Sequence, residues 1–296
     1  MVRLKRSQIA LDCSSRYTLS NSSRLLLTDC RYTVKSLGSK YGITPVFMAK
    51  PREGLPGNSG HMHVSIVDST GKNLFFREQT DPNPPYPDVA NVSDLGRYFL
   101  AGVLDGLPDV MPIMAPTINS YKRLVENFWA PVTVSWGLEH RAASIRVIAP
   151  PTCSPKGTRL EIRVPGADTN AHYVLAAVLA LGWRGVEKKL ALPVPPLPKG
   201  EDVGSSSDQG ARLAKNLKDA TAMFMRKESI AREVFGDEFV DHFGGTREHE
   251  VRLWEEAVTD WYVFILFFLT NVRVLLTNVK SGRSNDISRR YDELMT

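Results

Sequence analysis

The chain has 296 residues, of which 43% are hydrophobic and 23% are charged, a composition typical of globular proteins. The net charge of +5 is mildly basic, but no tract of five or more Lys or Arg and no motif that reads RNA or DNA accompanies it, so no nucleic-acid partner is expected. Its three cysteines are far apart and odd in number, which predicts neither a disulfide framework nor a zinc site.

The two ends of the chain differ from the rest in composition. Residues 1–22 are polar, serine-rich and aperiodic, and we expect them to be poorly ordered. No apolar segment of a secretory signal follows the basic first residues, so a cytoplasmic location is expected. Residues 261–296 form an atypical tail whose apolar run, 261–276, is shorter than the roughly 20 apolar residues of a membrane span. A buried helix or strand is expected there, with a membrane anchor as the alternative.

Apolar spacing, glycines and caps predict the elements of the first half. Leu and Val recur at helical spacing before Gly42, which ends the first helix, and Ser93 is a good N-cap for the second. The expected elements are a helix over 23–41, strands over 44–50 and 61–66, a hairpin turn at 69–72 and a helix from Ser93 to about Leu104.

The second half predicts further strands followed by helices. They are strands over 132–136, 144–148 and 158–164, then helices over 169–190, 208–225, 227–235 and 247–259. Trp183 and Trp254 are expected in the core. Strands interspersed with helices, without regular βαβ alternation, predict an α+β fold in which a curved, largely antiparallel sheet is flanked by helices.

Two of these strands carry polar groups on one face only. In T-R-L-E-I-R-V, alternation places Arg159, Glu161 and Arg163 on one face and apolar side chains on the other. The segment H-M-H-V-S-I has the same design, with His61, His63 and a serine hydroxyl on one face. A buried row of charge is costly unless it meets a partner, and anionic substrates and a metal ion are natural partners.

Four segments, in a fixed order, resemble the catalytic domain of the glutamine synthetase family. They read G-N-S-G-H-M-H-V-S from Gly57, P-T-I-N-S-Y-K-R-L-V from Pro116, R-A-A-S-I-R from Arg141 and K-G-T-R-L-E-I-R from Lys156. The resemblance covers about residues 23–260 and matches the C-terminal half to two-thirds of a full-length synthetase. It therefore implies an incomplete catalytic domain of this family.

The resemblance implies an ATP-dependent carboxylate–amine ligase. Such an enzyme converts glutamate and ATP to γ-glutamyl phosphate, which ammonia or another amine then attacks, with Mg²⁺ or Mn²⁺ as cofactor. Phosphoryl transfer of this kind needs metal ions and arginines that neutralise charge. The family also forms homo-oligomeric rings, which we do not assume for this chain.

The resemblance also assigns roles to individual residues. It implies metal ligation by His61 and Glu161, glutamate binding by Gly57, His63, Arg123 and Arg163, nucleotide binding by Ser65, Lys156 and Arg159, and catalytic roles for Arg141 and Arg146. Glycine suits a close approach of substrate to backbone, and the arginine fork suits a carboxylate. Because Arg141 and Arg146 are five residues apart, we expect a bend between them.

The sequence departs from the family pattern in three places. The family's N-terminal β-grasp domain has no counterpart here, nor has the first part of its catalytic domain, which carries four of six metal-ligand positions. We therefore expect little or no ligase activity from this chain. Trp129 occupies the position of a glutamate in ammonia-using members, which favours either a bulkier amine or a space-filling role. The alternative function is a non-catalytic structural or regulatory relative that assembles with other subunits.

Overall fold

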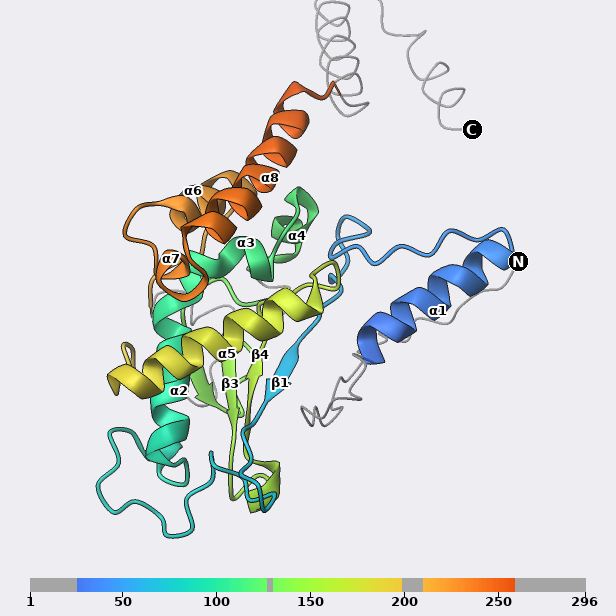
Figure 1. The fold of residues 1–296 in the computed structure, drawn as a ribbon. Helices are drawn as coiled ribbons and strands as arrows, with labels where there is room; N and C mark the ends of the chain where they lie inside the picture. Colours follow the sequence, from blue (N-terminus) through green and yellow to red (C-terminus); the bar gives the residue numbers. More distant parts are fainter. Residues whose placement is uncertain (1–25, 127–129, 199–209, 259–296) are drawn as a thin grey trace, which may run out of the picture. The chain divides into compact units, whose positions relative to one another are not determined.

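The computed structural model describes residues 26–126, 130–198 and 210–258 (Figure 1). The chain divides into two compact units, Met1–Val251 and Arg252–Thr296, and the fold below belongs to the first. The segments 1–22 and 261–296 and Trp129 lie outside the described residues. Within the described part of the chain, no helix combines the length and apolar character needed to cross a membrane.

A four-stranded sheet forms the centre of the first unit. Its strands are β1 (Met62–Val64), β2 (Trp136–Leu138), β3 (Ile145–Ile148) and β4 (Arg159–Ile162), in the order β1-β4-β3-β2. β4 pairs antiparallel with both β1 and β3, whereas β2 and β3 run parallel. The prediction of an α+β fold with a largely antiparallel sheet is therefore confirmed, with one parallel pair.

Eight α-helices accompany the sheet in the described residues. They are α1 (Leu26–Lys40), α2 (Asp94–Gly106), α3 (Met111–Met114), α4 (Ile118–Arg123), α5 (Ala171–Lys188), α6 (Leu217–Met225), α7 (Ile230–Phe235) and α8 (Asp237–Glu256). Two predicted boundaries are confirmed. The Ser93 side chain accepts a hydrogen bond from the Gly96 N–H at the start of α2, and Gly42, just after α1, takes the left-handed φ of 67° that glycine allows.

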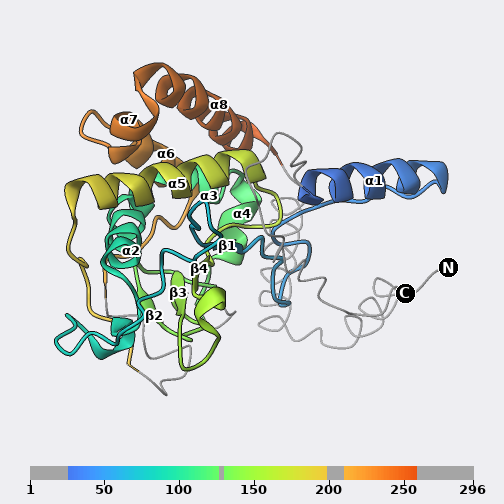
Figure 2. The same ribbon diagram turned by 60° about the horizontal axis from the view of Figure 1, so that its bottom comes forward.

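The core lies between the sheet and the pair α2 and α5 (Figure 2), with α6 and α7 beyond α5. The predicted packing stripe of α5 is buried: Val174, Ala177, Val178, Leu181 and Gly185. The two helices approach closely through glycines. A Cβ on Gly102 would lie 2.2 Å from the Leu181 carbonyl oxygen, and one on Gly185 would lie 2.2 Å from the Tyr98 carbonyl oxygen.

Several predicted elements were wrong in extent or kind. Residues 44–50 form no strand, because no described strand pairs with them, and Val46 is 64% exposed. Strand β2 begins only at Trp136, and Thr133 instead forms an isolated bridge with Arg212. Helix α6 begins later than predicted, at Leu217, and α8 begins earlier, at Asp237.

The predicted burial of two tryptophans was also wrong. Trp183 is 51% exposed and Trp254 is 50% exposed. Trp183 lies on the outer face of α5, opposite the buried stripe, and its indole N–H donates to Glu187 one turn further on at 3.0 Å. Among the tryptophans of the described residues, Trp136 is the fully buried one, and its indole N–H donates to the Val194 carbonyl at 2.8 Å.

The glycine contact between α2 and α5 gives a stability prediction. G185A should lower the free energy of unfolding by about 1–3 kcal/mol, because a methyl group would meet backbone atoms that cannot move aside cheaply. In α8, a Cβ on the exposed Gly245 meets nothing within 4 Å, so G245A should raise the free energy of unfolding by about 0.5–1 kcal/mol. Urea titrations of both variants measure these changes in the free energy of unfolding. Equal changes in the two variants would contradict the close contact between α2 and α5 at Gly185.

Candidate active site

Glu161 is the centre of the polar face of the sheet. It lies in the middle of β4, opposite His63 of β1 on one side and Arg146 of β3 on the other. Only 4% of it is exposed. Its Oε1 lies 2.6 Å from Arg163 Nη1 and 3.0 Å from His61 Nδ1, while its Oε2 accepts a hydrogen bond from Arg146 Nη1 at 3.0 Å.

These contacts keep the Glu161 carboxylate charged. Burial alone would raise its pKa, but the hydrogen bond from His61 and the charge of Arg163 outweigh burial, so the pKa of Glu161 lies far below its ordinary value. Burial lowers the pKa of His61, and this effect outweighs the hydrogen bond to Glu161. A neutral imidazole that donates from Nδ1 to Glu161 keeps a lone pair on Nε2.

His61 and Glu161 supply two donors that a divalent cation could share. The 3.0 Å between His61 Nδ1 and Glu161 Oε1 is a hydrogen bond, so the atom that His61 could offer to a cation is Nε2. However, no group of three or more His, Cys, Asp or Glu that could hold a metal occurs in the described residues. Both Glu161 oxygens also accept hydrogen bonds from arginines. The described residues therefore do not by themselves fit a resident Mg²⁺ or Mn²⁺.

Glu139 also belongs to the cluster, although it lies in none of the motifs that predicted the site. The residue follows β2 directly, and its Oε2 accepts from Arg146 Nε at 2.9 Å and from Arg146 Nη2. Thr152 Oγ1 donates to its other oxygen at 2.7 Å. A charged residue at the end of a buried strand, two positions before Arg141, is a weak sequence signal that could have indicated it.

Arg123 and Gly57 lie together beside the segment that follows β4. Arg123 is 4% exposed, and its Nη2 donates to the carbonyl oxygens of residues 163–165 at 2.8–3.1 Å. Burial lowers the pKa of Arg123 to about 10, so the side chain stays protonated at neutral pH. A Cβ on Gly57 would lie 2.6 Å from Arg123 Cγ and 2.5 Å from the Ala49 carbonyl oxygen. Close packing against Arg123 thus requires glycine at position 57.

The remaining predicted site residues lie nearer to solvent. Arg159 donates from Nε to His63 Nδ1 at 3.1 Å and from Nη1 to the Gly157 carbonyl at 2.8 Å. Ser65, Arg141 and Lys156 are exposed, and none of the three joins the hydrogen-bonded cluster in the described part of the chain. Arg141 lies in a turn and Arg146 in β3, so a bend does separate them.

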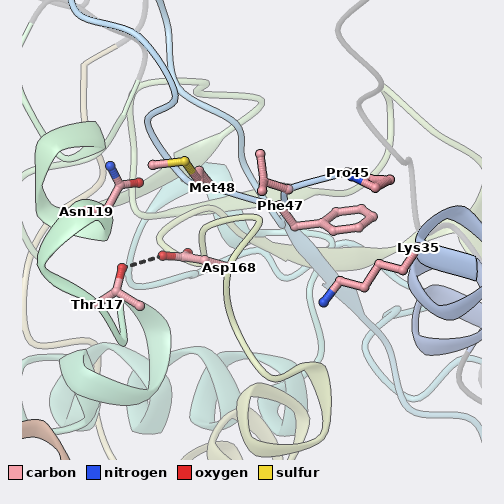
Figure 3. A pocket seen from close by; sticks show the side chains of 8 residues that line it. Lys35, Pro45, Phe47, Met48, Thr117, Asn119 and Asp168 are labelled. Carbon is pink, nitrogen blue, oxygen red and sulfur yellow. Dashed lines mark hydrogen bonds between the residues drawn. The ribbon is translucent and has the colours of Figure 1, made fainter. Parts of the chain in front are cut away.

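A cavity of about 380 Å³ lies elsewhere, between α1, residues 45–48 and the start of α4 (Figure 3). None of the predicted site residues lines it. Asp168 Oδ2 accepts from Thr117 Oγ1 at 2.8 Å, and the Asn119 side chain bonds both backbone groups of Lys50, whereas the buried Asp168 Oδ1 has no hydrogen-bond partner in the described residues. The charged cluster around Glu161 brings together four of the predicted site residues, His61, Arg146, Glu161 and Arg163, and is for that reason the better candidate for chemistry.

The cluster can bind anions. The charges of Arg146 and Arg163 are matched by those of Glu139 and Glu161. Arg159 lies at the same face, and Arg141 and Lys156 add positive charge to the segments around β3 and β4. A buried Nε–H of Arg163 has no hydrogen-bond partner in the described residues. The face thus offers an excess of cationic donors to a phosphate or a carboxylate.

Comparisons with known proteins point the same way. Residues 8–264 match the model of the family described as glutamine synthetase, catalytic domain. The chain is 41% identical over 249 residues to type-1 glutamine synthetase 2 of Dictyostelium discoideum, covering 82% of this chain and 44% of that protein. It is 36% identical over 228 residues to a glutamate–isopropylamine ligase of a Pseudomonas species, covering 77% of this chain and 47% of that protein.

A solved structure is similar as well. The apo structure of GmaS superposes with a TM-score of 0.65 at 28% identity, covering 79% of this chain and 50% of that one. The chain thus spans about half the length of the curated relatives it matches.

The buried carboxylate gives a prediction about stability and pH. E161Q should lower the free energy of unfolding by about 3–5 kcal/mol at pH 7, because it leaves the buried Arg163 and the half-buried Arg146 without their shared counterion. Since the pKa of Glu161 is depressed in the folded state, its contribution is complete above the ordinary glutamate pKa of about 4.3 and is lost as the pH falls below it. Denaturant titrations should therefore show that the difference in free energy of unfolding between wild type and E161Q becomes smaller from pH 6 to pH 3.5.

A matched control is E78Q, which removes the carboxylate of an exposed pair with Lys72. It should change stability much less than E161Q at every pH. If the difference in free energy of unfolding between wild type and E161Q stayed constant with pH, the result would contradict the depressed pKa of Glu161.

Proposed function

The chain belongs to the glutamine synthetase family, and from that premise we propose that it contributes the anion-binding part of a site that joins glutamate to an amine with ATP. The observation that carries the proposal is the set of arginines on the polar face: Arg146 and Arg163 share the carboxylate of Glu161, and Arg159 lies on the same face. Their cationic N–H groups outnumber the carboxylate acceptors beside them, and a bound carboxylate or phosphate would accept from them.

In this proposal different side chains of the chain bind glutamate, the nucleotide and the transferred phosphoryl group. Arg163 and Arg123 hold glutamate carboxylates, Arg159 and Lys156 contact the nucleotide, and Arg146 and Arg141 stabilise negative charge on the transferred phosphoryl group. His61 and Glu161 contribute two metal donors. Because these two donors do not complete a site, no catalytic step is assigned to a metal here.

The identity of the amine is a separate part of the proposal. Trp129, which lies outside the described residues, stands where ammonia-using family members carry a glutamate. An indole cannot accept a proton from ammonium, but its face attracts cations and its bulk suits an alkyl group. A relative that is 36% identical is named for isopropylamine. We therefore propose a small alkylamine, rather than ammonia, as the acceptor.

A second candidate function is a non-catalytic subunit that assembles with other chains of the family. The observation that favours it is the exposed apolar surface of α1 and the residues after it: Tyr32, Val34, Leu37, Tyr41, Ile43, Val46 and Met48. Apolar side chains gathered in this way are common at protein interfaces. Co-purification with a full-length family member, without turnover, would favour this candidate over the first.

Glutamate binding tests the role of Arg163. R163Q should weaken glutamate affinity about 10- to 100-fold, because a hydrogen bond between charged groups is worth roughly 1.5–3 kcal/mol. Calorimetric titration of the folded chain with glutamate measures this. The control is R232Q, which removes a surface arginine that pairs with Asp237 and Asp241 and should leave the affinity unchanged. Equal glutamate affinity of wild type and R163Q would refute the assignment.

Turnover is a separate prediction. ADP release by the purified chain with ATP, Mg²⁺ and glutamate should be far slower than the roughly 1 per second of ordinary enzymes, because the described residues supply only two metal donors. Any residual ADP release should be faster with isopropylamine than with ammonia. Release at an ordinary enzymatic rate would show that the metal shell is complete, and a preference for ammonia would contradict the proposed acceptor.

A further inference from the structure

Glu139 has a backbone conformation that glutamate rarely adopts. Its φ is 57°, and Lys189, at the C-terminal end of α5, is the only other described residue besides glycines with a positive φ. In the left-handed region a side chain with a Cβ is strained, so such residues persist only where surrounding contacts hold them. Strained residues of this kind gather at functional sites.

The contacts that hold Glu139 come from both its backbone and its side chain. The Glu139 N–H donates to the Val147 carbonyl at 2.9 Å, which ties the end of β2 to β3. The Thr152 hydroxyl fixes Oε1, and Oε2 receives Arg146. The carboxylate is therefore held at three points and points at one guanidinium.

Arg146 in turn is held by two carboxylates, that of Glu139 just after β2 and that of Glu161 in β4. A guanidinium has five N–H donors. In the described residues Glu139 takes two of them, at Nε and Nη2, and Glu161 takes one, at Nη1. Five minus three leaves one N–H on each terminal nitrogen. With its plane fixed on two sides, the side chain can offer these two donors to an anion without first losing conformational freedom.

We propose that Glu139 is the positioning residue of Arg146: its left-handed backbone at the end of β2 directs the carboxylate to the guanidinium, so that the two remaining N–H groups are presented to a phosphate-bearing ligand. The nature of that ligand rests on the proposed function, whereas the orientation of Arg146 does not. Glu139 itself need not touch the ligand.

Three variants separate backbone strain from side-chain function. E139N places a residue that tolerates the left-handed region but is one methylene too short to reach Arg146. E139Q keeps the length and an oxygen acceptor but removes the charge. K189N is the matched control, because it changes the other left-handed residue, which lies at the end of α5 and does not contact Arg146.

Two properties of each variant are measured. Calorimetric titration gives the affinity for ATP, and NMR gives the rate of hydrogen exchange of the Arg146 Nε–H, whose signal is assigned by its absence in R146K. We expect E139N to weaken ATP binding by about 10-fold, the order seen when a supporting hydrogen-bond partner is lost, and to speed exchange of the Nε–H. Its melting temperature should fall only slightly, because relief of the backbone strain offsets part of the lost pair with Arg146. E139Q should lose less affinity, and K189N none.

The outcomes separate this inference from the proposed function. A purely structural role for Glu139 predicts a lower melting temperature for E139N with unchanged ATP affinity, and that result would overturn the inference. If the wild-type chain binds no ATP, the proposed function fails, and the Nε–H exchange alone decides the role of Glu139. Slow exchange in wild type and fast exchange in E139N would then support it; equal exchange would reject it.

Discussion

The polar face of this protein depends on the burial of a single carboxylate, that of Glu161. A buried negative charge is unstable without counterions, and here Arg146 and Arg163 supply them from β3 and from the residue after β4. Glu161 in turn compensates the charge of the buried Arg163 and of the half-buried Arg146, which also pairs with Glu139. The cluster therefore forms as a unit, and it fixes the relative positions of three strands on the face that carries the candidate chemistry.

The site owes its rigidity to the elements that carry it. The charged groups of the Glu161 cluster stand on paired strands or directly beside them, and the helices α2 and α5 support the sheet from the apolar side. Arg123 extends this support, because it is the last residue of α4 and holds the chain after β4 through three carbonyl oxygens. A preorganised face of this kind suits the binding of ligands whose charge must be held in one place.

Local sequence patterns predicted the polar face of the sheet well, but they predicted the segments around the sheet less well. Alternation in T-R-L-E-I-R-V placed Glu161 and Arg163 on one side of β4, because side chains alternate regardless of tertiary context. The segment 44–50 has the composition of a strand, but a strand also needs a neighbour, which composition does not reveal. Glu139 was not predicted because its sequence signal is weak and tertiary contacts impose its left-handed backbone.

The row His63, Glu161 and Arg146 runs across three neighbouring strands in register. If β4 paired one residue out of step, Glu161 would turn into the apolar core, and Leu160 or Ile162 would take its place among the arginines. In such a mispaired sheet the Glu161 carboxylate would be buried in the core without a counterion. The guanidinium groups of Arg146 and Arg163 would lack a carboxylate on the other face. The residues that suit this face to binding anions thus also specify the register of β4 during folding, because they make the alignment that is shifted by one residue too unstable to persist.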